Sequence, residues 1–202
     1  MVADTAKHVL VDSLYLLALI NPVSKISILA AFPPDEERGV FGRVIGESSL
    51  AAAGILLVAM AAGDFILRTI FHVDLYSLRV AGGSVLFWIG FNALRKGVFY
   101  ERDTHEHFAD IAVVPLACPM IAGPGTITAC LGLTSQNGLA RAVAPMLLAL
   151  GINTILMFFA RPISVALDRW NILGAVIRFT GLIVMTIGTQ MVLDGLRQWW
   201  GA

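Results

Sequence analysis

Long apolar stretches dominate the chain, and six of them are long enough to cross a lipid bilayer as helices. A spanning helix needs about 20 mostly apolar residues. The six stretches run from Val9 to Phe32, Val40 to Ala62, Leu78 to Val98, Ala109 to Leu133, Ala142 to Ala160 and Ile172 to Leu196. The connections between them are short. The pattern therefore predicts an all-α, polytopic membrane protein that forms one membrane domain over residues 1–202.

The composition favours the same interpretation and excludes several function classes. Of the 202 residues, 57% are hydrophobic and 14% are charged, whereas a soluble domain carries about 25% charged residues. The 14 basic and 14 acidic residues balance, and the basic ones are scattered, so we expect the lipid bilayer and no nucleic acid as a partner. The predicted helices hold no catalytic triad, carboxylate pair or zinc-ligand pattern, so we expect no enzyme. We interpret His105-Glu106-His107 as a solvated loop and not as a metal site.

The distribution of Lys and Arg predicts the orientation of the helices. Seven basic residues lie at the connections after the first, third and fifth stretches: Arg38, Arg43, Arg95, Lys96, Arg102, Arg161 and Arg169. Five lie on the opposite side: Lys7, Arg68, Arg79, Arg141 and Arg197. Because cytoplasmic loops carry the excess of basic residues, we predict that both termini lie on the outer side.

The two halves of the chain, about residues 8–100 and 108–200, are weakly similar. The third and sixth stretches match at an arginine and three glycines, which pair as Arg79 with Arg178, Gly82 with Gly181, Gly90 with Gly188 and Gly97 with Gly195. Each half has three predicted crossings, so the halves must be inverted relative to each other. Inverted repeats are typical of secondary transporters; the alternative is a duplication without a transport role.

Two of the predicted helices are interrupted at matching positions of the repeat. Asn21-Pro22 breaks the first, and Gly123-Pro124-Gly125 breaks the fourth, because proline removes a backbone donor and glycine permits a sharp turn. Freed backbone groups in a membrane need protein partners or a cavity. Helix N-termini bind anions and the opposite ends bind cations. The predicted substrate-binding residues are Asn21, Pro22, Ser24, Ser27, Gly123, Pro124, Gly125, Thr126 and Thr128; the alternative is a pair of simple proline kinks.

Charged residues inside the predicted helices are a second indication of function, since charges in a bilayer are costly. Lys25 lies about one turn beyond the first break, where it could fill the site as a tethered cation, pair with a carboxylate, or extend to the interface. Glu47 is the candidate proton carrier or partner of Lys25, and the alternative is a contact with lipid headgroups. Arg79, Arg178, Asp110 and Asp194 lie near helix ends, where we expect them at the membrane interface.

Three segments carry a resemblance to a known family. They are Asn21-Pro22, Arg79-Val80-Ala81-Gly82-Gly83 and Pro115-Leu116-Ala117-Cys118-Pro119-Met120-Ile121-Ala122-Gly123-Pro124-Gly125. Together they resemble the MarC family of bacterial inner-membrane proteins over nearly the whole chain. The resemblance implies the bacterial inner membrane, and some relatives look like neutral amino-acid transporters coupled to sodium or protons. The chain departs from the family pattern after the first break, where Lys25 stands at a position that is usually neutral.

The sequence thus predicts a secondary transporter for small neutral amino acids or similar small polar solutes. No nucleotide-binding motif is present, so an ion gradient, Na⁺ or H⁺, is the expected energy source and no other cofactor is expected. A small-ion channel or carrier and a non-transporting structural protein are the alternatives. The small residues of the second and third stretches predict close helix packing, either within one protomer or in a homo-oligomer.

Overall fold

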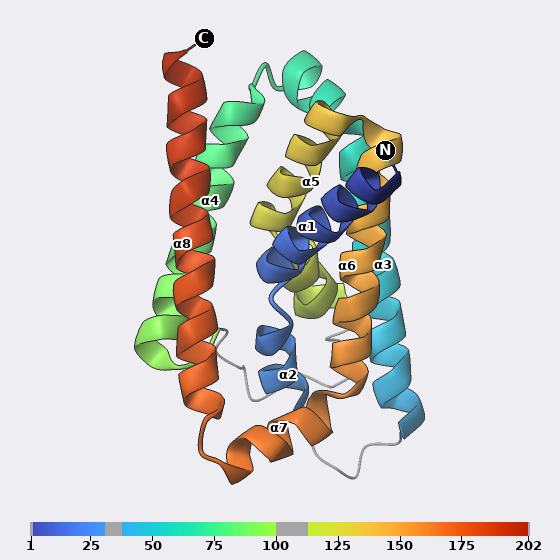
Figure 1. Ribbon diagram of the computed structural model, residues 1–202, viewed down its shortest axis with the longest axis vertical. Coiled ribbons are helices and arrows are strands. Elements are labelled where there is room, and N and C mark those ends of the chain that lie inside the picture. Colours follow the sequence, from blue (N-terminus) through green and yellow to red (C-terminus); the bar gives the residue numbers. More distant parts are fainter. Residues whose placement is uncertain (1, 31–37, 100–112, 202) are drawn as a thin grey trace.

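The computed structural model describes residues 2–30, 38–99 and 113–201, and this part of the chain is helical with no strand (Figure 1). The all-α prediction is therefore confirmed. In chain order the helices are α1 (Val2–Ile20), α2 (Pro22–Ala30), α3 (Arg38–Phe65), η1 (Ile66–Ile70), α4 (Leu75–Lys96), η3 (Val113–Ile121), α5 (Pro124–Asn137), α6 (Leu139–Phe158), α7 (Ala160–Arg169) and α8 (Leu173–Trp200). The two segments labelled η are π-helices. The loop with His105 and His107, and also Asp110, lies outside the described residues.

Four helices of the described part are each long and apolar enough to cross a membrane. They are α3 continued through η1, α4, α6 and α8. A fifth crossing results if α1 and α2, which are bent by 42° at their junction, count as one span. This confirms a multi-pass membrane protein. The predicted fourth stretch, Ala109–Leu133, begins outside the described residues and continues as η3 and α5.

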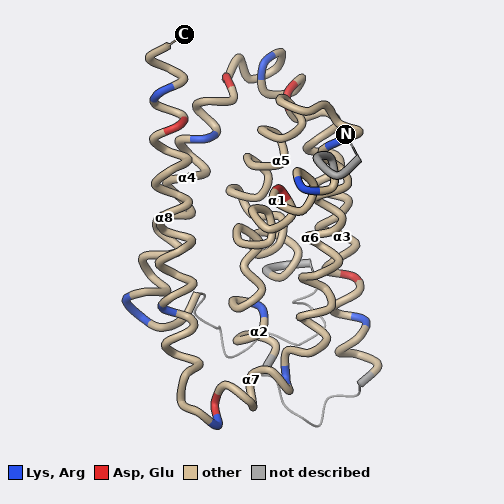
Figure 2. Tube along the Cα trace, viewed as in Figure 1, with Lys and Arg blue, Asp and Glu red and all other residues tan. Residues whose placement is uncertain are grey.

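Charged residues and the chain ends are arranged as a membrane bundle requires. The described charges lie mostly toward the two ends of the bundle, and few occur at mid-height (Figure 2). The start of α1 and the end of α8 lie toward the same end of the bundle (Figure 1). An even number of crossings would produce this placement.

One helix was not predicted: α7 lies across the opposite end of the bundle, between α6 and α8 (Figure 1). The sequence interpretation treated this segment as a loop because it is short and carries Arg161, Pro162 and Arg169. Proline is tolerated in the first turn of a helix, and Ala160 and Ser164, one turn apart, are buried together. Arg161 lies over the ring of Phe41, 4.7 Å from its centre. An apolar face and a charged face are typical of a helix that lies in the membrane interface.

Helices α4 and α8 pack side by side through glycines (Figure 1). A Cβ atom on Gly90 would lie 2.5 Å from the carbonyl oxygen of Gly181, and one on Gly83 would lie 2.6 Å from that of Gly188. Real Cβ atoms do not approach backbone so closely, so only glycine fits at these points. Small residues of this kind let membrane helices touch through their backbones.

Candidate functional site

The first break separates α1 from α2 near mid-height of the bundle (Figure 1). Asn21 alone joins them, with a φ angle of 55° in the left-handed region, which asparagine tolerates better than most residues. Its N–H still donates to Leu17 O at 2.9 Å, so it closes the last turn of α1. Pro22 then starts α2, a position that suits its fixed φ and missing N–H. The Asn-Pro pair thus ends one helix and begins the next.

The second break separates η3 from α5. Gly123 joins them in an extended conformation, with φ −80° and ψ 167°, and Pro124 begins α5. A Cβ atom on Gly123 would lie 2.5 Å from the carbonyl oxygen of Pro119, so the chain passes too close to itself for a side chain. The sequence prediction of two breaks corresponds to these two junctions.

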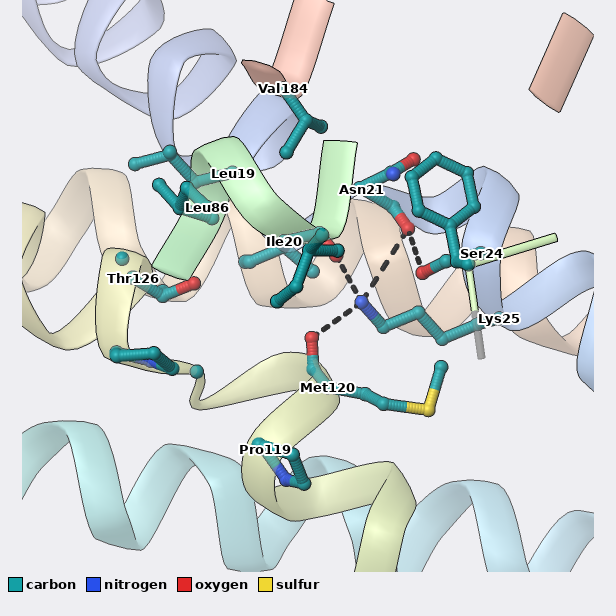
Figure 3. A pocket seen from close by; sticks show the side chains of 15 residues that line it. Leu19, Ile20, Asn21, Ser24, Lys25, Leu86, Pro119, Met120, Thr126 and Val184 are labelled. Carbon is teal, nitrogen blue, oxygen red and sulfur yellow. Dashed lines mark hydrogen bonds between the residues drawn. The ribbon is translucent and has the colours of Figure 1, made fainter. Parts of the chain in front are cut away.

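Lys25 connects the two breaks. Its side chain is 1% exposed and turns back from α2 toward the end of α1 (Figure 3). The Nζ atom donates to the carbonyl oxygen of Ile20, to that of Met120 at 2.6 Å and, more weakly, to that of Asn21 at 3.4 Å. Lys25 therefore bridges the first half of the chain to the second and does not extend to the membrane interface.

The sequence leaves the carbonyl oxygens of Ile20 and Met120 available to Lys25. In a continuous helix the N–H of Ser24 would donate to Ile20, but here it donates to Asn21 O at 3.2 Å. Pro124, four residues after Met120, has no N–H that could donate to it. Both oxygens lie at the C-terminal ends of helices, α1 and η3, where helix dipoles favour positive charge. The ammonium group of Lys25 occupies that position.

A small cavity of about 30 Å³ lies at the junction. Six of the nine residues predicted to bind substrate line it, together with Lys25: Asn21, Ser24, Gly123, Pro124, Gly125 and Thr126. Leu86 and Val184 close its other side (Figure 3). A volume of this size holds a water molecule and excludes an amino acid.

The remaining predicted residues lie elsewhere. Pro22 lines an apolar groove with Leu14 and Ile183. The hydroxyl group of Ser27 donates to Ser24 O at 2.9 Å, within its own helix. Thr128 likewise donates to Pro124 O, at 2.7 Å.

Glu47 is not brought to Lys25. Its side chain is exposed on α3, and its carboxylate lies 3.9 Å from Nε of Arg43. Arg43 precedes Glu47 by four residues, one turn of helix, so the pair forms locally. Among the described residues, the hydrogen bonds of the Lys25 ammonium go to backbone carbonyls and not to a carboxylate.

A larger polar cavity, of about 250 Å³, was not predicted from the sequence. It lies among α1, α4, α5 and α8 and is lined by Asp12, Tyr15, Arg79, Thr128, Ala129, Gly132, Leu133, Gln136, Met191 and Asp194. We expected Arg79 and Asp194 at the membrane interface because they lie near helix ends. The position of a residue along its own helix does not show which other helices surround that residue, so the shared cavity was not predicted. Asp12, a charge within the first apolar stretch, was the one available signal.

One family model and several known proteins match this chain over nearly its full length. The family described as "MarC family integral membrane protein" matches residues 6–200. A UPF0056 membrane protein of Pyrococcus horikoshii is 35% identical over 189 residues, which cover 94% of this chain and 93% of the relative. The UPF0056 inner membrane protein MarC of Citrobacter koseri is 29% identical, with 96% of each chain covered. One from Aquifex aeolicus is 27% identical, with 91% and 90% covered. No solved structure matches.

Proposed function

The chain belongs to the MarC family of integral membrane proteins, and from that premise we propose that it is a secondary transporter for small neutral amino acids or similar small polar solutes. The observation that carries the proposal is the meeting of two broken helices, one from each half, around a buried polar point. Secondary transporters place solute and ion sites at such breaks. We assign the protein no enzymatic reaction and no cofactor other than a coupling ion.

The proposal includes six crossings in two inverted repeats, residues 8–100 and 108–200, with both termini on the outer side of the inner membrane. The glycine contacts between α4 and α8 support it. In the repeat, Gly90 pairs with Gly188 and Gly181 pairs with Gly82. If the two halves are equivalent, the contact between Gly90 and Gly181 should therefore have a counterpart between Gly188 and the Gly82-Gly83 pair. The structure has that second contact, at Gly83, and a two-fold axis between α4 and α8 would require it.

The larger cavity supports a zwitterionic solute. It offers the guanidinium group of Arg79 and the carboxylates of Asp12 and Asp194, the charges that complement an amino acid. Among the described residues no ion pair within 4.0 Å joins Arg79 to either carboxylate. Asp194 accepts a hydrogen bond from Nε2 of Gln190 at 2.9 Å. Arg79 and Asp12 are therefore the charged groups of this cavity that we assign to the solute. Thr128 borders this cavity at the start of α5, close to the second break.

Reconstitution into proteoliposomes tests the proposal. We expect saturable uptake of labelled neutral amino acids that depends on an imposed ion gradient and is absent from empty vesicles. Preloading with unlabelled solute should drive transient accumulation of label, which a carrier produces and a channel does not. Absence of uptake for all neutral amino acids under every imposed gradient would contradict the proposal, and uptake without counterflow would favour a channel.

Replacement of Arg79 should weaken solute binding. A charge-assisted hydrogen bond contributes roughly 1.5–3 kcal/mol, so Arg79→Gln is expected to raise KM for uptake by about tenfold or more. Arg197→Gln is the matched control, because Arg197 is exposed near the end of α8 and does not line the cavity. Equal KM values for the two variants would exclude Arg79 from recognition of the solute.

A further inference from the structure

Three backbone carbonyl oxygens converge on one buried point between the two halves of the chain. They belong to Ile20, the last residue of α1, to Met120, in the last turn of η3, and to Asn21, whose oxygen also accepts hydrogen bonds from the N–H and the hydroxyl group of Ser24. Carbonyl oxygens at the C-terminal ends of broken helices are ligands for monovalent cations in membrane transporters. The point therefore has the chemistry of a site for Na⁺ or K⁺.

The Nζ atom of Lys25 stands at this point (Figure 3). In its protonated form it carries the same unit charge as a monovalent cation, and it makes hydrogen bonds where such an ion would make coordination bonds. The adjoining cavity of about 30 Å³ leaves little space beside it, and two like charges so close would repel each other. A free cation and the Lys25 ammonium cannot both be held here.

We propose that the carbonyl groups of Ile20 and Met120, with a weaker contribution from that of Asn21, form a monovalent-cation site that the ammonium group of Lys25 fills. Lys25 is thus a built-in substitute for an ion. In the repeat alignment the position of Lys25 corresponds to Ile127 in the second half, so only the first break supplies a tethered charge. The cation site does not depend on the proposed function. One consequence does depend on the proposed function: the transporter needs no sodium at this point.

Thermal unfolding of the purified full-length chain in NaCl, KCl and choline chloride of equal ionic strength tests the site. The melting temperature of the wild type should be the same in the three salts. Lys25→Ala should unfold at a lower temperature in choline chloride and should recover by roughly 5–10 °C, in a saturable way, with Na⁺ or K⁺ at about a hundred times its Kd. Lys25→Met is the matched control, because its uncharged side chain fills the same space and should block the rescue.

Either of two results would overturn the proposal: stabilisation of the wild type by Na⁺ over choline, or equal responses of Lys25→Ala to all three salts. If the variants do not fold, the wild-type comparison decides alone, since a site open to sodium must respond to it. This readout does not require transport, so a failure of uptake would refute the proposed function and leave the cation site in place. Conversely, wild-type uptake driven by a sodium gradient without stabilisation of the wild type by Na⁺ over choline would support a transporter whose sodium site lies away from Lys25.

Discussion

Gly90→Val is expected to destabilise the protein severely and to reduce the yield of folded material. At Gly90 the first side-chain atom would lie 2.5 Å from both Gly181 O and Met185 N, and these are backbone atoms of α8 that no rotamer change can move. Added atoms in a close-packed contact cost about 1–3 kcal/mol even where side chains can adjust. Valine adds two further carbons, so we expect a loss at or above about 3 kcal/mol.

The control for this variant is Gly54→Val on α3. Gly54 has no atom within 4 Å of the place its Cβ would occupy, so the same substitution meets open space. Thermal unfolding followed by size-exclusion chromatography should show a large loss for Gly90→Val and little change for Gly54→Val. Gly83→Val should resemble Gly90→Val, because its Cβ would lie 2.6 Å from Gly188 O. Equal melting temperatures for Gly90→Val and Gly54→Val would mean that α4 and α8 do not touch as described.

Gly123→Ala is expected to reduce uptake by tenfold or more while most of the fold persists. The new methyl group would lie 2.5 Å from the carbonyl oxygen of Pro119, so η3 and α5 must move apart. Met120 follows Pro119 directly, and its carbonyl oxygen is 2.6 Å from Nζ of Lys25. The substitution therefore disturbs the contact between the two halves without removing any group that makes it.

Gly151→Ala on α6 provides the comparison, since nothing lies within 4 Å of its Cβ position. Initial rates of uptake, normalised to the amount of folded protein, should fall for Gly123→Ala and remain near the wild-type value for Gly151→Ala. A Gly123→Ala variant with full uptake would separate the second break from transport.

The two breaks were predictable because their causes are local. Asn21-Pro22 and Gly123-Pro124 interrupt a helix wherever they occur in it, since the missing N–H and the close backbone approach are properties of those residues. That Lys25 is buried was not predictable, because a lysine within an apolar stretch can also extend its side chain to the interface. Which oxygens it contacts was not predictable, because Met120 lies 95 residues away in the sequence.

The polar cavity and α7 were not predictable for a different reason. Arg79, Asp12 and Asp194 come together only because α1, α4 and α8 are packed in a particular register, which apolar periodicity does not determine. Likewise α7 has a polar face and ten residues, so a search for long apolar stretches passes over it. Glu47, the candidate partner of Lys25, does not reach it, because the Glu47 side chain is exposed on α3 beside Arg43, one helical turn away.

The glycine contacts between α4 and α8 have a mechanical consequence. Two helices whose backbones touch at separate points along their length have no side chains at those points that could rearrange, so we expect the pair to move as one rigid body. Leu86 of α4 and Val184 of α8 both lie on this body and both line the small cavity beside Lys25. A tilt of the pair against α1, α2 and α5 would therefore change the cavity from two sides at once, and the broken helices would act as the fixed wall.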